Sequence, residues 1–206
     1  RKAMIPLIIN LFSILSVALL TESAHALEQP KFEVIEQMEG VEIRRYESRI
    51  VARTLMSGDF DDAGNRGFRR LAGYIFGGNE TGNKIAMTAP VDMAAANGKS
   101  EGRYWITFGM PNEYDLSELP HPEDRRVELL VEPEKYMAVL KYKGGWSEAR
   151  FNKNRLRLLE TMEQSMDWVM QGEPVWARYN PPFTPGFLKR NEVAIEVVRG
   201  RVVTHD

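Results

Sequence analysis

A pattern that occurs twice along the chain constrains its fold more than any other feature of the sequence. Residues 58–63 contain, in order, a glycine, an aromatic residue, two residues of helix-capping type and an alanine, and residues 144–149 repeat that order. Each copy precedes a segment with apolar residues at helical spacing, and strand-like alternation lies on both sides of each helical segment. The chain is therefore predicted to contain two strand–strand–helix–strand–strand units. Two copies are too few for a solenoid, so we expect one α+β domain in which both helices pack against a shared sheet or barrel.

The first unit is predicted from alternating segments and one amphipathic helix. The helix is expected to begin within residues 59–62, where acidic residues suit the positive end of the helix dipole, and to end at Gly77 and Gly78. Strands are predicted within residues 32–34, 41–43, 50–56 and 103–110. The apolar residues of the helix recur at a spacing of three or four: Ala63, Gly67, Phe68, Leu71, Ala72 and Ile75.

Residues 84–91 are predicted to form a further strand of this unit. They are mostly apolar, they follow a glycine-rich loop, and they include Pro90 near their end. Because proline lacks the N–H group that a sheet ladder needs, we expect this strand to leave the sheet at Pro90. Alternation then places Ile85, Met87 and Ala89 on one face of the sheet.

The second unit follows the same plan. Alternation predicts strands within residues 127–131, 136–142, 175–179 and 193–197. Apolar residues from Phe151 to Val169 keep a spacing of three or four, so the second helix is predicted to continue until Gly172 and Pro174 end it. The connecting residues 96–102 and 111–126 are polar or proline-rich and are predicted to be loops.

Residues 1–26 are predicted to be a secretory signal peptide rather than part of the fold. Arg1 and Lys2 supply positive charge, residues 4–20 are almost entirely apolar, and Ala24-His25-Ala26 has the small-residue pattern of a cleavage site. An uncleaved membrane anchor is the alternative, since a span needs about 20 apolar residues. The predicted cleavage site favours a signal peptide that is removed over an uncleaved membrane anchor. The domain then comprises residues 27–206, exported to the periplasm or secreted, with no stable membrane span after cleavage.

Composition excludes several classes of function. The formal net charge is -2, which gives no basic surface for nucleic acid. Cysteine is absent, which excludes disulfides, thiolate metal sites and cysteine nucleophiles. The sequence also lacks a Gly-x-Ser-x-Gly elbow, a His-Glu-x-x-His site and a phosphate-binding glycine loop. We therefore predict that the protein is not an enzyme. No motif indicates an oligomeric state.

Three segments together carry a resemblance to a known family. They are Gly67–Asn79, Lys84–Val91 and Ala177–Val193, the last beginning Ala-Arg-Tyr-Asn-Pro-Pro. In this order and spacing they resemble the SOUL heme-binding protein family, over about residues 31–199. The resemblance implies a distorted β-barrel of two pseudo-symmetric halves, each with one main helix. It also implies binding of heme or a related tetrapyrrole in an apolar surface slot.

The resemblance places the tetrapyrrole against the first helix and a proline-rich loop. The implied helix residues are Phe68, Leu71 and Ala72, although Leu71 and Ala72 are better explained as ordinary core. The implied loop residues are Phe183, Thr184 and Phe187. The two phenylalanines flank a Pro-Gly turn and are hard to bury completely, which makes them the better candidates.

Cations and iron ligands are less well matched. The propionate partners credited in relatives fall on uncharged residues here. The available substitutes are Arg66, Arg69 and Arg70 on the helix and Lys189 and Arg190 after the loop, although solvated surface is the more frequent role of such residues. Of the three histidines, His25 lies in the predicted signal peptide, His121 in a loop and His205 at the C-terminus. If heme binds, we therefore expect apolar and propionate contacts without a strong axial ligand.

The leading hypothesis is an exported carrier, buffer or scavenger of heme or another tetrapyrrole. A second hypothesis is a small-molecule effector-binding module, since the two-repeat plan is also similar to gyrase-inhibitor-like domains. A third is an enzyme that processes tetrapyrroles, which ranks last because no acid–base or metal-ligand constellation is visible. A fourth is a protein-interaction role for Phe183 and Phe187.

Overall fold

The structure is a computed structural model that describes residues 27–96 and 102–200. The predicted signal peptide, most of the polar loop at residues 96–102 and His205 lie outside the described residues. Two α-helices, nine strands and one short 3-10 helix make up the described part. Their bounds are β1 (Phe32–Met38), β2 (Val41–Tyr46), β3 (Arg49–Ser57), α1 (Phe60–Ile75), β4 (Val91–Ala95), β5 (Arg103–Gly109), β6 (Val127–Glu132), β7 (Lys135–Lys143), α2 (Glu148–Glu163), β8 (Trp168–Arg178), η1 (Gly186–Leu188) and β9 (Arg190–Arg199).

All nine strands belong to one antiparallel sheet with the order β1-β2-β7-β9-β8-β4-β5-β3-β6. Apart from β1, this order is symmetrical about the central β8–β4 pair. The strands β4, β5, β3 and β6 on one side correspond to β8, β9, β7 and β2 on the other, and β4 and β8 each follow a helix. The two predicted units are therefore confirmed, and they pair through the strand that follows each helix. Strand β1 is an addition beside β2.

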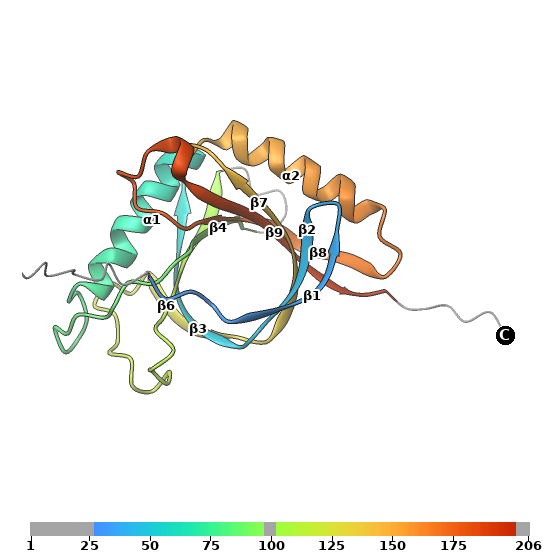
Figure 1. Cartoon of the computed structure of the whole chain (residues 1–206). Helices are drawn as coiled ribbons and strands as arrows, with labels where there is room; N and C mark the ends of the chain where they lie inside the picture. The colour runs from blue at the N-terminus through green and yellow to red at the C-terminus, as the bar shows by residue number, and fades with distance from the viewer. Residues whose placement is uncertain (1–26, 97–101, 201–206) are drawn as a thin grey trace, which may run out of the picture.

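The sheet curls strongly, and both helices lie on its outer, convex side (Figure 1). In the strand order β1 and β6 are the two edges, so the expected distorted β-barrel needs correction: the sheet curls but does not close, because β1 and β6 are not paired with each other. The main core lies between the helices and the sheet, where Leu71 of α1 and Leu158 of α2 are fully buried. The predicted α+β class is confirmed. Among the described residues, no helix has the length and apolar character needed to cross a membrane.

The strand predicted at residues 84–91 is wrong. Residues 84–87 carry no regular structure, Thr88 forms only an isolated bridge with Glu28, and β4 begins at Val91. Pro90, in a cis peptide bond with Ala89, therefore precedes the strand instead of ending it, a position that suits a residue without an N–H group. The apolar residues before it serve packing: Ile85 is buried, and its N–H donates to the carbonyl of Ile75 at the end of α1.

The predicted extension of the second helix to Val169 is also wrong. Helix α2 ends at Glu163, and Met166 is 96% exposed. Strand β8 begins at Trp168, which is buried, well before the predicted start at Val175. Gly172 and Pro174 interrupt β8 at a register shift instead of ending a helix. The apolar spacing continues past Glu163, but Met166 and Val169 are exposed while Trp168 is buried, so these residues do not extend the buried face of α2.

Candidate functional site

The concave face of the sheet, opposite the helices, forms a cavity of about 220 Å³. Strand alternation determines which residues line it. On β4, Asp92 and Ala94 face the cavity while Val91 and Met93 pack in the core beneath the helices. Other parts of the wall come from Tyr46, Arg49, Trp105, Glu132, Met137, Tyr179 and Glu192.

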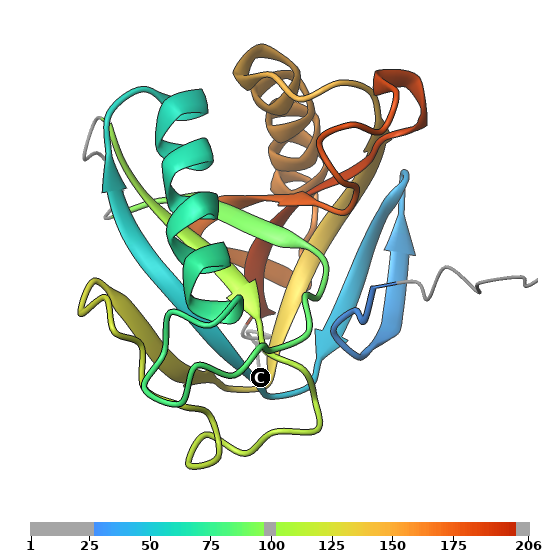
Figure 2. The same ribbon diagram turned by 90° about the vertical axis from the view of Figure 1, so that its left-hand side faces the viewer.

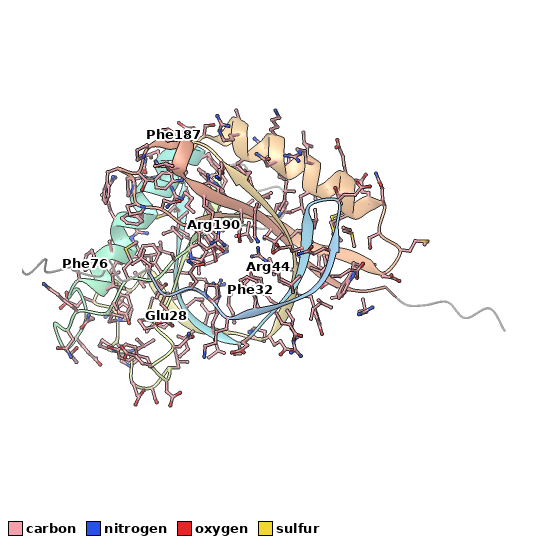
Figure 3. The ribbon with its side chains drawn as sticks, in the orientation of Figure 1. Glu28, Phe32, Arg44, Phe76, Phe187 and Arg190 are labelled. Carbon is pink, nitrogen blue, oxygen red and sulfur yellow. The ribbon has the colours of Figure 1, made fainter. Side chains whose placement is uncertain are left out.

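Glu192 is the centre of a buried polar network at this cavity. The guanidinium of Arg44, which is 0% exposed, donates to its two carboxylate oxygens at 2.9 and 3.1 Å. The hydroxyl of Tyr179 and the guanidinium of Arg190 each donate to it at 2.7 Å. Figure 3 shows Arg44 on the inner side of the curled sheet. Burial alone would raise the pKa of Glu192, but the hydrogen bonds and charge of Arg44 outweigh it and hold that pKa below its ordinary value.

A second network lies at the same cavity around Arg49. Its guanidinium donates to Asp92 and to Glu132, each at 2.9 Å. Burial raises the pKa of Asp92 in spite of Arg49, whereas the charges of Arg49 and Lys135 lower the pKa of Glu132 against the effect of burial. The ionic groups of both networks are therefore occupied by one another. A volume of about 220 Å³ is below the roughly 300–1,000 Å³ typical of sites for drug-sized ligands, so the cavity suits a molecule smaller than a tetrapyrrole.

The predicted helix residues lie on α1 at different depths. Leu71 is fully buried in the core, so a surface ligand does not reach it. Phe68 is half-buried, with its ring 5.4 Å from that of Phe108, and Ala72 is half-buried. Arg69 is exposed and lines a shallow hollow beside the helix. The core role considered for Leu71 is thus the observed one.

The predicted loop residues also differ in how far they are exposed to solvent. Phe183 is 87% exposed and Phe187 is 75% exposed, while Thr184 is half-buried. Lys189 is buried: its Nζ donates to the carbonyl of Pro182 at 2.9 Å and lies 3.8 Å from the centre of the Trp146 ring. The expectation that Lys189 is a surface cation for a propionate therefore needs correction, because its ammonium group holds the loop closed.

The two predicted surfaces do not form one continuous wall. Figure 2 shows α1 and the 181–189 loop on either side of α2. Phe187 lies near the start of the helices, whereas Phe76 is at the far end of α1 (Figure 3). Of the three histidines considered as iron ligands, His121 lies within the described residues and is exposed in its loop. Within residues 27–96 and 102–200, no group of three His, Asp or Glu side chains is placed to hold a metal ion.

Sequence reasoning missed the residues of the concave cavity. Asp92 lies between Val91 and Met93, and Glu192 lies between Asn191 and Val193. Such charged residues within apolar alternation are usually on the solvent face of a sheet. Several strands carry ionisable residues on that face, but a face open to water shows the same pattern, so the sequence carried no signal that distinguishes the cavity.

Comparisons with known proteins agree on the family and on the fold. Residues 27–196 match the family described as "SOUL heme-binding protein". The human protein named "Heme-binding protein 2" is 31% identical over 180 residues, which cover 82% of this chain and 85% of the human protein. The mouse protein of the same name is 30% identical over 175 residues, which cover 81% and 83%. The EcmrR C-terminal domain is similar in fold, with a TM-score of 0.61 at 10% identity over 78% of this chain and 98% of that domain.

Proposed function

The chain belongs to the SOUL heme-binding protein family, and from this membership we propose that it binds heme or a related tetrapyrrole on its outer surface. The observation that carries the proposal is the exposed apolar loop at residues 181–189. Phe183, Phe187 and Leu188 are 87%, 75% and 58% exposed, and three large apolar side chains in so short a segment cost free energy in water. A flat apolar ring that covers them would recover about 1.5–3 kcal/mol for each side chain.

The residues present fit a tetrapyrrole that is held by apolar and ionic contacts. The loop offers aromatic faces for the ring, whereas the exposed Arg69 lines a separate hollow on α1, so an ionic contact would have to come from a cation that borders the loop. Heme, when bound, would supply the iron and the two propionates, and no described histidine lies on the loop or on α1 to coordinate the iron. Together with the predicted signal peptide, this supports the role of an exported carrier, buffer or scavenger.

A second candidate function is the binding of a small polar molecule in the concave cavity. The observation that favours it is the cavity itself, with ionisable residues from β2, β3, β4, β6 and β9 around it. This candidate corresponds to an effector-binding module.

Titration of the full chain with hemin, followed in the Soret band, tests the proposed function. We expect saturable binding, and the double variant Phe183→Ala/Phe187→Ala is expected to weaken it about tenfold or more, because the loss of one buried aromatic contact is worth over 1.4 kcal/mol. Phe76→Ala is the matched control, because Phe76 is 59% exposed but lies at the other end of α1.

The variant Ala94→Leu extends the same titration to the cavity, because Ala94 lines the cavity on β4. Unchanged hemin affinity in this variant supports the outer surface. A loss of affinity in Ala94→Leu with full affinity in the loop double variant would place the ligand in the cavity. Absence of saturable binding at micromolar hemin contradicts the proposed function.

A further inference from the structure

Arg178 is a buried cation with no partner among the described residues. Its side chain is 8% exposed, and its Nε and Nη2 atoms are buried without a hydrogen bond. The other two deeply placed arginines are different, since Arg44 contacts Glu42 and Glu192 and Arg49 contacts Asp92 and Glu132. A buried guanidinium without a carboxylate costs several kcal/mol. Burial accordingly lowers the pKa of Arg178 to about 10.

The surroundings of Arg178 contain further unused donors. Its Cζ lies 5.0 Å from the ring centres of both Trp146 and Trp176. The indole N–H groups of these two tryptophans and the hydroxyl of Tyr142 are buried; the Trp176 indole lies against the Tyr142 hydroxyl, whereas the Trp146 indole has no hydrogen-bond partner among the described residues. Lys189 adds a second buried cation over the Trp146 ring. Cation–π contacts account for part of the stability of Arg178, but they leave its N–H edge unsatisfied.

The beginnings of the two helices meet at this cluster. The rings of Phe60 in α1 and Phe151 in α2 stack at 5.7 Å, and both stack on Trp176. Gly64 allows α1 to approach, because a Cβ atom there would lie 3.7 Å from Nη2 of Arg178. Helix N-termini carry partial positive charge. The cluster therefore combines two cations, the neutral groups of Trp146, Trp176 and Tyr142, and two helix N-termini, while the carboxylates of Asp61 and Asp92 act on Arg178 through their charge without a hydrogen bond.

The cluster also borders the exposed loop. Gly186 packs on Gly145, where an added Cβ would lie 3.5 Å from its Cα, and Lys189 lies over Trp146. Trp146 is half-buried and covers Arg178. Alternation along β8 separates this cluster from the concave cavity: Ala177 and Tyr179 line the cavity, while Arg178 lies on the helix side of the sheet.

We propose that Arg178 is the receptor for a carboxylate of the ligand, and that the protein selects acid-bearing ligands over neutral ones at this point. The Nε and Nη2 atoms form the edge of a guanidinium that accepts a carboxylate with two parallel hydrogen bonds. The inference rests on the proposed function. A tetrapyrrole that covers Phe183 and Phe187 would bring a propionate to the Trp146 side chain, which lies over Arg178. Displacement of the Trp146 indole, which follows Gly144 and Gly145, opens the edge to the carboxylate.

The test compares hemin with hemin dimethyl ester, which has the same ring without free carboxylates, on the full chain. We expect the native protein to bind hemin about tenfold to a hundredfold more tightly than the ester, the range for charge-assisted hydrogen bonds. Arg178→Met should abolish this preference by weakening hemin alone. Arg53→Met is the matched control, because Arg53 also lies over a tryptophan, at 4.1 Å from Trp105, but is paired with Glu128.

A second arm separates this inference from the proposed function. Sodium propionate alone is titrated while tryptophan fluorescence is followed, since Trp146 and Trp176 flank the site. A saturable change in the native protein that is lost in Arg178→Met supports the carboxylate site even if hemin does not bind. Equal affinity for hemin and its ester, or no propionate response in the native protein when hemin does not bind, overturns the inference. A lower melting temperature of Arg178→Met with unchanged hemin preference also overturns it, because Arg178 would then be purely structural.

Discussion

Gly67 sets how closely α1 can approach the sheet. A Cβ atom at this position would lie 2.8 Å from Cβ of Ile106 in β5, a distance that real contacts do not reach. Gly73, two turns later on the same helix, is exposed and has no atom within 4 Å of such a Cβ. The two glycines therefore have opposite consequences for stability, although both interrupt the same helix.

We predict that Gly67→Ala lowers the free energy of unfolding by about 1–3 kcal/mol, because α1 must move away from Ile106. Gly73→Ala should raise it by about 0.5–1 kcal/mol, because alanine is the better helix former. Urea denaturation of both variants measures the difference. A shift of the same sign in both variants would contradict the packing argument.

Other single residues show where the local sequence pattern predicts burial correctly and where it does not. The helical spacing correctly placed Gly67 and Leu71 on the buried face of α1. From the sequence, Lys189 is expected at the surface as a cation for a propionate, because lysine is seldom buried. Its ammonium group is instead held by Pro182 and Trp146, two residues that only the folded loop brings to it.

At the level of elements, the two helices begin differently. Ser147 is the N-cap of α2 and accepts a hydrogen bond from the N–H of Arg150 at 3.3 Å. Asp59 is the N-cap of α1, but its side chain accepts no such bond. The sequence suggests a capping residue before each helix, and the structure uses the side chain of only one.

We predict that Ser147→Ala lowers the free energy of unfolding by about 1 kcal/mol, because the N–H of Arg150 loses its partner. Asp59→Ala is the comparison, and it should cost about 0.5 kcal/mol or less, which corresponds to the lost interaction of its charge with the helix dipole. Thermal or urea denaturation of both variants measures these changes. An equal or larger loss in Asp59→Ala would show that the cap of α1 acts through its side chain after all.

At the scale of the whole molecule, Glu192 joins strands that are distant in sequence. It connects β9 to Arg44 of β2 and to Tyr179 after β8. Its folded pKa is below the ordinary value of 4.5. The ionised carboxylate therefore contributes stability that is fully present above pH 4.5 and is lost as the pH falls through the folded pKa. Asp92, whose pKa is raised by burial, acts in the opposite direction.

We predict that Glu192→Gln lowers the free energy of unfolding at pH 7 by about 3 kcal/mol, because Arg44 keeps only Glu42 as a carboxylate partner. The variant should also lose less stability than the native protein below pH 4.5. Glu33→Gln is the control, because Glu33 and Arg45 form an exposed pair that contributes less than about 1 kcal/mol. Parallel pH curves for the native protein and Glu192→Gln would contradict the assignment of the acid-sensitive group.

The sequence by itself determined the two-unit plan, the α+β class and the family. These depend on periodicity and on short motifs, which are local properties that no distant contact has to complete. The Phe183–Phe187 turn could be singled out for the same reason. Two phenylalanines that flank a Pro-Gly turn are hard to bury completely, and this follows from the local sequence. The strand order symmetrical about β8 and β4 then follows from placing the two copies in one sheet.

Only the tertiary structure decided the chemistry of the two faces. The curl of the sheet turns Asp92 and Glu192 from apparent solvent positions into walls of a cavity, because inward curvature withdraws that face from water. The convergence of α1, α2 and β8 buries Arg178 without a partner. Only the tertiary structure shows that a strand begins at Trp168 and that Pro90 precedes a strand. Each outcome depends on contacts between separate strands and helices, which no local pattern encodes.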